Sequence, residues 1–278
     1  MSEAHPAHDC PPPAPPPRGL LRGLCNCGRR PTRRTPGGGC VTIRDTPIET
    51  PDLAIYSQDE QLAAGVPPTW DSPDIITNDW GPFRLMKEAR VKVRNLSPTT
   101  FAANAAVHYF TAPFGIGTRR QLRLTRVVSL APLQELELLF PLHQEVLSGD
   151  PRAGVHIQID HPADNSVINN RGSQVHDGGY TTESGRDFVV KIPVLNDSGV
   201  SRQFTLNVLP TDLIATVAPA VHTFAPFEQI VASLHIVVPA FLTGSPGSEI
   251  PRSATVMARI AGGGQVIGGA TRLLRINN

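Results

Sequence analysis

The feature that most constrains the fold of this chain is the recurrence of apolar residues at every second position within short segments. In Arg186–Leu195 these residues are Phe188, Val190, Ile192 and Val194. A period of two is typical of a β-strand with one face in the core and the other in water. An amphipathic helix would instead need apolar residues three and four positions apart. The pattern therefore predicts strands.

The same alternation recurs at short intervals along the chain. The strands predicted in the first half are Pro51–Tyr56, Ala89–Asn95, Asn104–Phe110, Gln121–Leu130, Gln134–Phe140 and Gly154–Asp160. Those predicted in the second half are Arg186–Leu195, Ser201–Leu209, Asp212–Val217, Glu228–Val238, Ser253–Ile260 and Gln265–Ile276. Proline (28 residues) and glycine (24 residues) are abundant, which suits many short strands joined by turns.

A chain of 278 residues has room for two ordinary domains. The pattern predicts an all-β fold of two tandem immunoglobulin-like antiparallel β-sandwiches, at residues 50–176 and 177–278, joined by a polar link at His176–Gly179. Arg186–Leu195 and Ser201–Leu209 are expected to form a hairpin, because Asn196–Gly199 between them has turn chemistry. No strong sequence repeat relates the two domains.

The stretch Gly154–Gln174 reads as the last strand of the first sandwich and its exit toward the second. Its polar turn contains the main candidate metal ligands, Asp160, Asp164 and Asn165. Calcium prefers six to eight oxygen ligands, which loops at one end of a sandwich can supply, here with help from Asp59 or Asp74. The alternative is plain turn chemistry, since Asp and Asn favour turns for backbone reasons alone.

Residues 1–45 form a basic arm rich in Pro, Arg and Gly, with no apolar periodicity. Such a composition cannot bury enough surface to offset the entropy of ordering, so a disordered arm is expected. The four cysteines of the chain all lie here, at Cys10, Cys25, Cys27 and Cys40. They allow three readings: a zinc site, disulfides or free thiols. The Cys25-Asn26-Cys27 spacing is tighter than the usual zinc motif.

Charge and hydropathy limit the classes of partner. The net charge of +1 gives no overall field toward nucleic acid or membrane, and the arginines of the arm have no interleaved aromatic residues for base stacking. No apolar run reaches the roughly 18 residues of a membrane span. The N-terminus has no apolar core typical of a signal peptide, so the protein is expected in the cytoplasm or exported by a non-classical route.

Motifs of catalysis are not evident in the sequence. Gly262–Gly264 lacks the Gly-Lys-Ser/Thr of a phosphate loop and reads as a hairpin turn. The histidines are scattered, and His156 and His235 fall on outward strand positions, where a solvated side chain is the ordinary case. We therefore expect a protein that is not an enzyme and has no organic cofactor. The enzyme alternative would use the loops around Asp160 and His161 for hydrolysis.

Several short motifs carry a resemblance to a known family. They are Asp52–Tyr56, Trp70–Ile75, Val91–Asn95, Ala105–Phe110, Gly154–Asp160, Asp164-Asn165 and Asn169-Asn170. Together they resemble bacterial immunoglobulin-like modules of the CARDB type, over about residues 50–176. The resemblance implies a β-sandwich with an adhesive or spacer role, and it brings no shared catalytic residues.

We therefore predict a non-enzymatic structural or interaction module of a bacterial or phage-derived surface or particle assembly. Its contacts would come from the arm and the loops at the sandwich ends, with a protein partner or a second copy. One alternative is a carbohydrate- or surface-binding adhesin that uses Trp70, Trp80 or Tyr180. A second alternative is an accessory domain protein of a hydrolase system.

Overall fold

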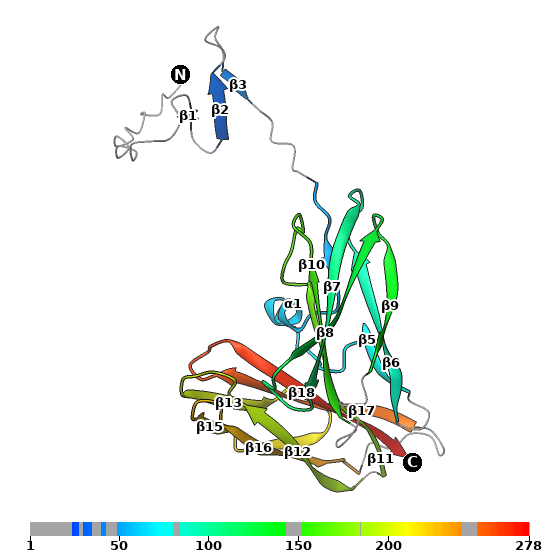
Figure 1. Ribbon diagram of the computed structural model, residues 1–278. Coiled ribbons are helices and arrows are strands. Elements are labelled where there is room, and N and C mark those ends of the chain that lie inside the picture. The colour runs from blue at the N-terminus through cyan, green and yellow to red at the C-terminus, as the bar shows by residue number, and fades with distance from the viewer. Residues whose placement is uncertain are drawn as a thin grey trace, which may run out of the picture. The chain divides into compact units, whose positions relative to one another are not determined.

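The computed structural model describes residues 49–79, 84–142, 152–183, 185–240 and 249–277, together with three short strands nearer the N-terminus (Figure 1). The chain divides into two compact units, Met1–Ile48 and Glu49–Asn278. In the first unit, β1 (Leu24–Cys27), β2 (Arg30–Arg34) and β3 (Cys40–Thr42) form a three-stranded antiparallel sheet. The rest of the predicted arm lies outside the described residues.

The second unit is built almost entirely from strands, which confirms the all-β class. Its first half contains β4 (Leu53–Ala54), α1 (Gln58–Ala63), β5 (Ile75–Asp79), β6 (Arg84–Asn95), β7 (Ala102–Pro113), β8 (Gln121–Leu130), β9 (Glu135–Pro141) and β10 (Ala153–Asp160). Its second half contains β11 (Arg171–Glu183), β12 (Asp187–Leu195), β13 (Arg202–Val208), β14 (Ile214–Ala218), β15 (Val221–Phe224), β16 (Gln229–Val237), β17 (Glu249–Ile260) and β18 (Val266–Asn277).

One eight-stranded sheet runs through both sandwiches, in the order β15-β13-β17-β18-β11-β10-β7-β8. Two smaller layers complete them: β4, β5 and β9 around β6 in the first, and β12-β16-β14 in the second. The strand that links the halves is β11. Its first residues pair antiparallel with β10, and from His176 onward it pairs parallel with β18. The predicted polar link at His176–Gly179 was therefore wrong, because these residues are part of a strand.

The two halves have separate hydrophobic cores on opposite faces of the shared sheet where they meet. On β10, Val155, Ile157 and Ile159 alternate into the first core. Gly154 precedes Val155, so it lies on the opposite face of β10. Its pairing partner on β11, Val175, belongs to the second core. Since neighbouring residues of a strand point to opposite faces, the sheet separates the cores.

The loop between β7 and β8 fastens the first sandwich to the second. Ile116 is buried in the second core. Its backbone N–H donates to the Pro193 carbonyl at 2.8 Å, and the Leu195 N–H donates to the Ile116 carbonyl at 2.9 Å. Gly117 has φ +71°, and a Cβ there would overlap the Leu195 carbonyl. Only glycine lets the loop approach so closely.

Two expectations about local structure were wrong. β12 and β13 do not form a hairpin: β12 pairs with β16, whereas β13 pairs with β15 and β17 in the other sheet. The turn between them carries the chain across the sandwich. The segment around Asp59 and Glu60, whose acidic and polar residues predict a loop, is instead α1, because the Ser57 hydroxyl accepts from the Glu60 N–H and caps the helix.

The end of β6 forms a corner centred on a buried asparagine. Asn95 is 1% exposed, and its Nδ2 donates to the carbonyls of Thr100 (2.8 Å) and Ala131 (3.2 Å). Its backbone N–H donates to the Gln134 carbonyl at 2.9 Å. Leu133, which lies between Ala131 and Gln134, has φ 57°, and its N–H donates to the Ser97 carbonyl.

The same corner recurs at the end of β12. Asn196 is 1% exposed, and its Nδ2 donates to the carbonyls of Val200 and Ala225, both at 2.9 Å. The Asn196 N–H donates to the Glu228 carbonyl at 2.9 Å. Phe227 has φ 59°, and its N–H donates to the Ser198 carbonyl.

These two corners share a sequence signature. Val-x-Val-x-Asn-x-Ser ends β6 and Ile-x-Val-x-Asn-x-Ser ends β12, and they are matched by Ala-Pro-Leu-Gln at 131–134 and Ala-Pro-Phe-Glu at 225–228. In both, the final Gln or Glu side chain accepts from the alanine N–H at the start of the motif. The expectation of no strong repeat was therefore incomplete, because the repeat consists of a few residues that meet only after folding.

Replacing the second corner asparagine should destabilise the protein strongly. We expect Asn196→Ala to lower the free energy of unfolding by about 2 kcal/mol, since the buried amide's hydrogen bonds to the carbonyls of Val200 and Ala225 are both lost. Asn207→Ala on the exposed face of β13 is the matched control and should cost less than about 0.5 kcal/mol. Urea unfolding measures both. Equal losses for the two variants would contradict the role of the corner.

The core of the first sandwich contains a hydroxyl without a partner. Tyr109 is fully buried and stacks on Phe140 with ring centroids 4.8 Å apart. Its hydroxyl has no hydrogen-bond partner among the described residues, and burial raises the pKa of this phenol. By contrast, the Tyr56 hydroxyl accepts from the Thr69 N–H at 3.0 Å.

Removing these two hydroxyls should have opposite effects. Tyr109→Phe is expected to raise the free energy of unfolding by about 1 kcal/mol, because an unsatisfied buried hydroxyl is costly. Tyr56→Phe should lower it by about 1 kcal/mol, because a hydrogen bond is lost. Thermal or urea unfolding of the two variants tests the pair. Destabilisation by Tyr109→Phe would show that its hydroxyl has a partner.

Candidate functional site

The predicted calcium ligands are held by hydrogen bonds within the protein. Asp160, at the end of β10, accepts from Gln158 Nε2 at 2.8 Å and lies 3.1 Å from His108 Nε2. These contacts lie on the surface of the shared sheet. They belong to an ordinary polar row across neighbouring strands, because Gln158 pairs with His108 and Asp160 follows on the same face.

Asp164 and Asn165 fasten the β10–β11 connection to the start of the second unit. Asp164 Oδ1 accepts from the backbone N–H of Leu53 at 3.2 Å, and Oδ2 accepts from Asn170 Nδ2 at 3.0 Å. The Asn165 N–H donates to the Pro51 carbonyl at 2.9 Å. Asp164 Oδ1 also accepts from the Ser166 N–H at 3.2 Å, a local contact typical of an aspartate in a turn.

The additional carboxylates proposed for calcium lie elsewhere. Asp59 is in the first turn of α1. Asp74 is 3% exposed and receives two hydrogen bonds from the Arg94 guanidinium, at 2.6 and 2.7 Å, which raise the pKa of Arg94. The described residues include no group of three or more His, Cys, Asp or Glu side chains that could hold a metal ion.

Several sequence candidates fall outside what the structure describes. The side chains of Cys10, Cys25, Cys27 and Cys40 are among them, so zinc and disulfides stay predictions. Trp80 and the side chain of Tyr180 are also outside. Trp70 is described, and it is 3% exposed against β18, where a Cβ on Gly269 would overlap its ring. It therefore caps the core and offers no exposed ring to a sugar.

The residues of the hydrolase alternative are separated by their contacts. His161 Nε2 lies 3.0 Å from the Ala103 carbonyl, and its Nδ1 accepts from the Ala163 N–H at 3.2 Å. Both ring nitrogens thus contact backbone, while the neighbouring Asp160 contacts His108. His161 in this arrangement supports the turn.

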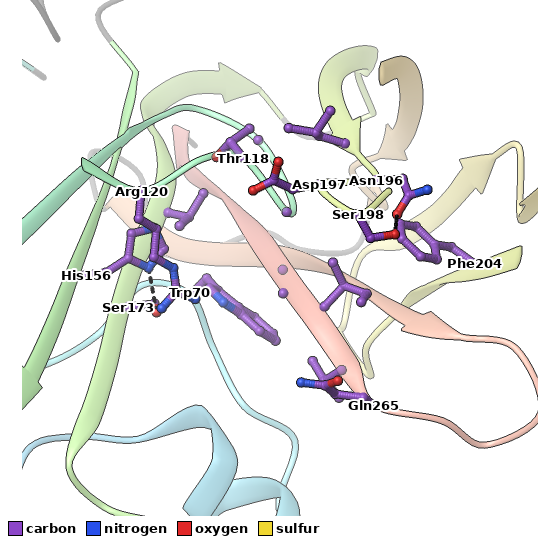
Figure 2. A pocket seen from close by; sticks show the side chains of 18 of the residues that line it. Trp70, Thr118, Arg120, His156, Ser173, Asn196, Asp197, Ser198, Phe204 and Gln265 are labelled. Atoms are coloured by element: carbon purple, nitrogen blue, oxygen red, sulfur yellow. Dashed lines mark hydrogen bonds between the residues drawn. The ribbon is translucent and has the colours of Figure 1, made fainter. Parts of the chain in front are cut away.

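The structure instead contains a cavity of about 460 Å³ where the two sandwiches meet (Figure 2). Its walls come from the β7–β8 loop, β10, β11, the β12–β13 turn, β13 and the first residues of β18. In Figure 2, Arg120, His156 and Ser173 are grouped on one side, and Asn196 and Ser198 lie on the other. Sequence reasoning missed this cavity because its walls are far apart in the chain.

A buried histidine lies in the wall of the cavity. His156 was expected in water, but it is 7% exposed, because the second sandwich covers its face of the shared sheet. Its Nδ1 lies 2.9 Å from the Ser173 hydroxyl. Burial lowers the pKa of His156 well below its ordinary value, and the nearby charge of Arg120 lowers it further. The imidazole is neutral at pH 7. The expectation for His235, which is 46% exposed, was correct.

Two arginines line the same cavity without partners. Neither Arg120 nor Arg202 makes a side-chain hydrogen bond or an ion pair within the described part of the chain. Burial and the charge of Arg171 lower the pKa of Arg120, while the charge of Asp59 raises it. The wall also contains the carboxylate of Asp197. Its Oδ1 lies 2.5 Å from Nε of Arg119, a residue that does not line the cavity.

A second surface feature is β8, the last strand of the shared sheet within the described residues. Leu122, Leu124 and Val127 on it are 56%, 36% and 64% exposed. No Asp or Glu occurs between Asn95 and Glu135, whereas Arg119, Arg120, Arg123 and Arg126 all lie on or just before β8. This edge is both apolar and basic.

Comparisons with known proteins add little. No family model matches the chain, and no curated protein matches it. Within the described residues, no helix is long and apolar enough to cross a membrane.

Three solved structures are similar in part. SSP-19, an MSP-domain-like protein of Caenorhabditis elegans, matches at 10% identity with a TM-score of 0.24, over 35% of this chain and 92% of its own. Alpha-2-macroglobulin of Escherichia coli matches at 9% identity with a TM-score of 0.28, over 89% of this chain and 24% of its own length. The CupB6 tip adhesin of Pseudomonas aeruginosa matches at 7% identity with a TM-score of 0.20, over 82% of this chain and 99% of its own length. Similarity this low supports no argument about function.

The buried histidine should make stability depend on pH. The unfolded state binds a proton at His156 below about pH 6.5, but the native state resists protonation there. Stability is therefore expected to fall with decreasing pH below about 6.5, by up to about 1.4 kcal/mol per unit from this group. Between pH 6.5 and 5, the free energy of unfolding of His156→Gln should depend less steeply on pH than that of the wild type. The exposed control His235→Gln should keep the wild-type slope. Urea unfolding measures the slopes, and equal slopes would contradict the assignment.

Proposed function

We propose that this protein is a non-enzymatic interaction module that joins a surface or particle assembly through edge strand β8. The single observation that carries the proposal is the combination of exposed apolar side chains with Arg123 and Arg126 on β8, a strand that ends the shared sheet within the described residues. An exposed strand edge is a template on which another extended segment can add a strand. The predicted resemblance to CARDB-type modules, with adhesive or spacer roles, agrees with such a use.

The partner segment should be extended and acidic. Val127 pairs with Ala106 and Leu122 with Phe110, so both point away from the first core and are available to alternate residues of an added strand. The basic residues of β8 favour carboxylates at the intervening positions. A second copy of β8 would instead bring arginines against arginines, which disfavours self-pairing.

The rest of the fold suits a passive scaffold. The shared sheet and the inserted β7–β8 loop connect the two sandwiches by backbone hydrogen bonds. An edge held by such a framework is already in its binding conformation, so little ordering entropy is lost on its side. The residues of the hydrolase and glycan-binding alternatives, His161 and Trp70, are occupied in supporting the turn and the core.

Binding of defined peptides tests the proposal. We expect a labelled peptide that alternates valine and glutamate to bind in fluorescence anisotropy, and to bind less tightly as salt is raised. The same peptide with lysine for glutamate should not bind. Val127→Asp places a negative charge beside the glutamates of the peptide and should weaken binding about tenfold, equivalent to about 1.4 kcal/mol.

The matched control lies at the other end of the same sheet. Val221 on β15 is 52% exposed, and Val221→Asp should leave peptide binding unchanged. Equal loss in both variants, or equal binding of the two peptides, would contradict the β8 proposal. A dimer that dissociates on Val127→Asp would point to a second copy as the occupant.

A further inference from the structure

We infer that the cavity between the two sandwiches is a binding site for a small organic anion, with Arg120 as the main contact to its carboxylate or phosphate group and Arg202 as a second cation. This site is separate from the outward face of β8.

The guanidinium groups of the cavity lining make no direct contact with a carboxylate among the described residues, although the charge of Asp59 acts on Arg120. Arg120 and Arg202 have no side-chain hydrogen bonds or ion pairs in the part of the chain that the structure describes. Asp197 contributes a carboxylate, but Arg119 pairs with it from outside the lining. Arg120 is exposed and Arg202 is half-buried, so both can be reached from solvent, and a guanidinium is suited to bind a carboxylate or phosphate with two parallel hydrogen bonds.

Neutral polar groups lie beside Arg120. His156 is neutral, so it adds no charge that would compete with the guanidinium. Its Nδ1 contacts the Ser173 hydroxyl, and these two side chains lie next to Arg120 in Figure 2. An anion on Arg120 would therefore sit within reach of an uncharged imidazole and hydroxyl. This arrangement fixes orientation, whereas the arginine provides attraction.

Apolar side chains complete the lining of the cavity. Trp70 lies on the same side as His156 and Ser173 in Figure 2, and Leu195 and Ile267 also contribute to the walls. A volume of about 460 Å³ lies within the range typical of small-molecule sites, roughly 300–1,000 Å³. The ligand class is thus a small acid with an apolar or aromatic part.

Titration calorimetry with simple probes tests this inference. Benzoate and phenyl phosphate represent the two sources of the anionic group, and benzamide is the neutral counterpart of benzoate. We expect one-site saturable binding of at least one of the two anions to the full chain, and no binding of benzamide. Whichever anion binds more tightly identifies the head group.

Matched variants assign the binding to Arg120. Arg120→Gln should weaken the bound anion at least about tenfold, equivalent to one decade in Kd. Arg202→Gln should weaken it less. Arg90→Gln on the exposed face of β6 removes the same charge outside the cavity and should have no effect. Because Arg120 makes no side-chain hydrogen bond or ion pair with the described residues, its replacement should leave the melting temperature unchanged, which circular dichroism checks.

The outcomes are distinct. Loss of binding with Arg120→Gln and not with Arg90→Gln supports the site. A change in the His156 ring signals in NMR on addition of the anion, absent in Arg120→Gln, supports it further and would remain informative if Arg120→Gln were less stable. No saturable binding of either anion, or equal affinity in Arg120→Gln, overturns the inference.

Discussion

The architecture of residues 49–278 depends on one strand that changes its partners. β11 pairs antiparallel with β10 along its first residues and then parallel with β18. Its hydrogen bonds therefore belong to both sandwiches, and the two cores lie on opposite faces of the sheet that it completes. Two sandwiches joined by a loose linker would rotate freely. Here the junction is itself sheet, and this is why a cavity of fixed walls can exist beside His156 and Arg120.

The two asparagine corners explain how the sandwiches resemble one another without an obvious repeat. In each corner one buried amide satisfies carbonyls of two separate turns, and a residue with positive φ closes the return of the chain. Geometry of this kind needs only a few matched residues. The surrounding loops are therefore free to differ, and the β7–β8 loop of the first sandwich has become the contact to the second.

Local alternation predicted the strands well and their partners poorly. β8, β9, β12 and β16 lie close to the expected segments, because side-chain period follows directly from backbone geometry. Alternation does not specify which strand lies alongside, so the β12–β13 hairpin was wrong. His156 shows the same limit: its outward position was correct, but the second sandwich covers that face. The cavity was not predictable, because Arg120, Ser173 and Gln265 meet only through the tertiary fold.

The position of β18 has a mechanical consequence. This strand lies inside the shared sheet, between β17 on one side and β11 on the other. Its hydrogen bonds run across the strand direction, so tension applied along β18 would load both ladders in shear, with many bonds resisting at once. An edge strand under the same tension could peel away bond by bond. The ladders on the two sides of β18 would therefore resist such tension together.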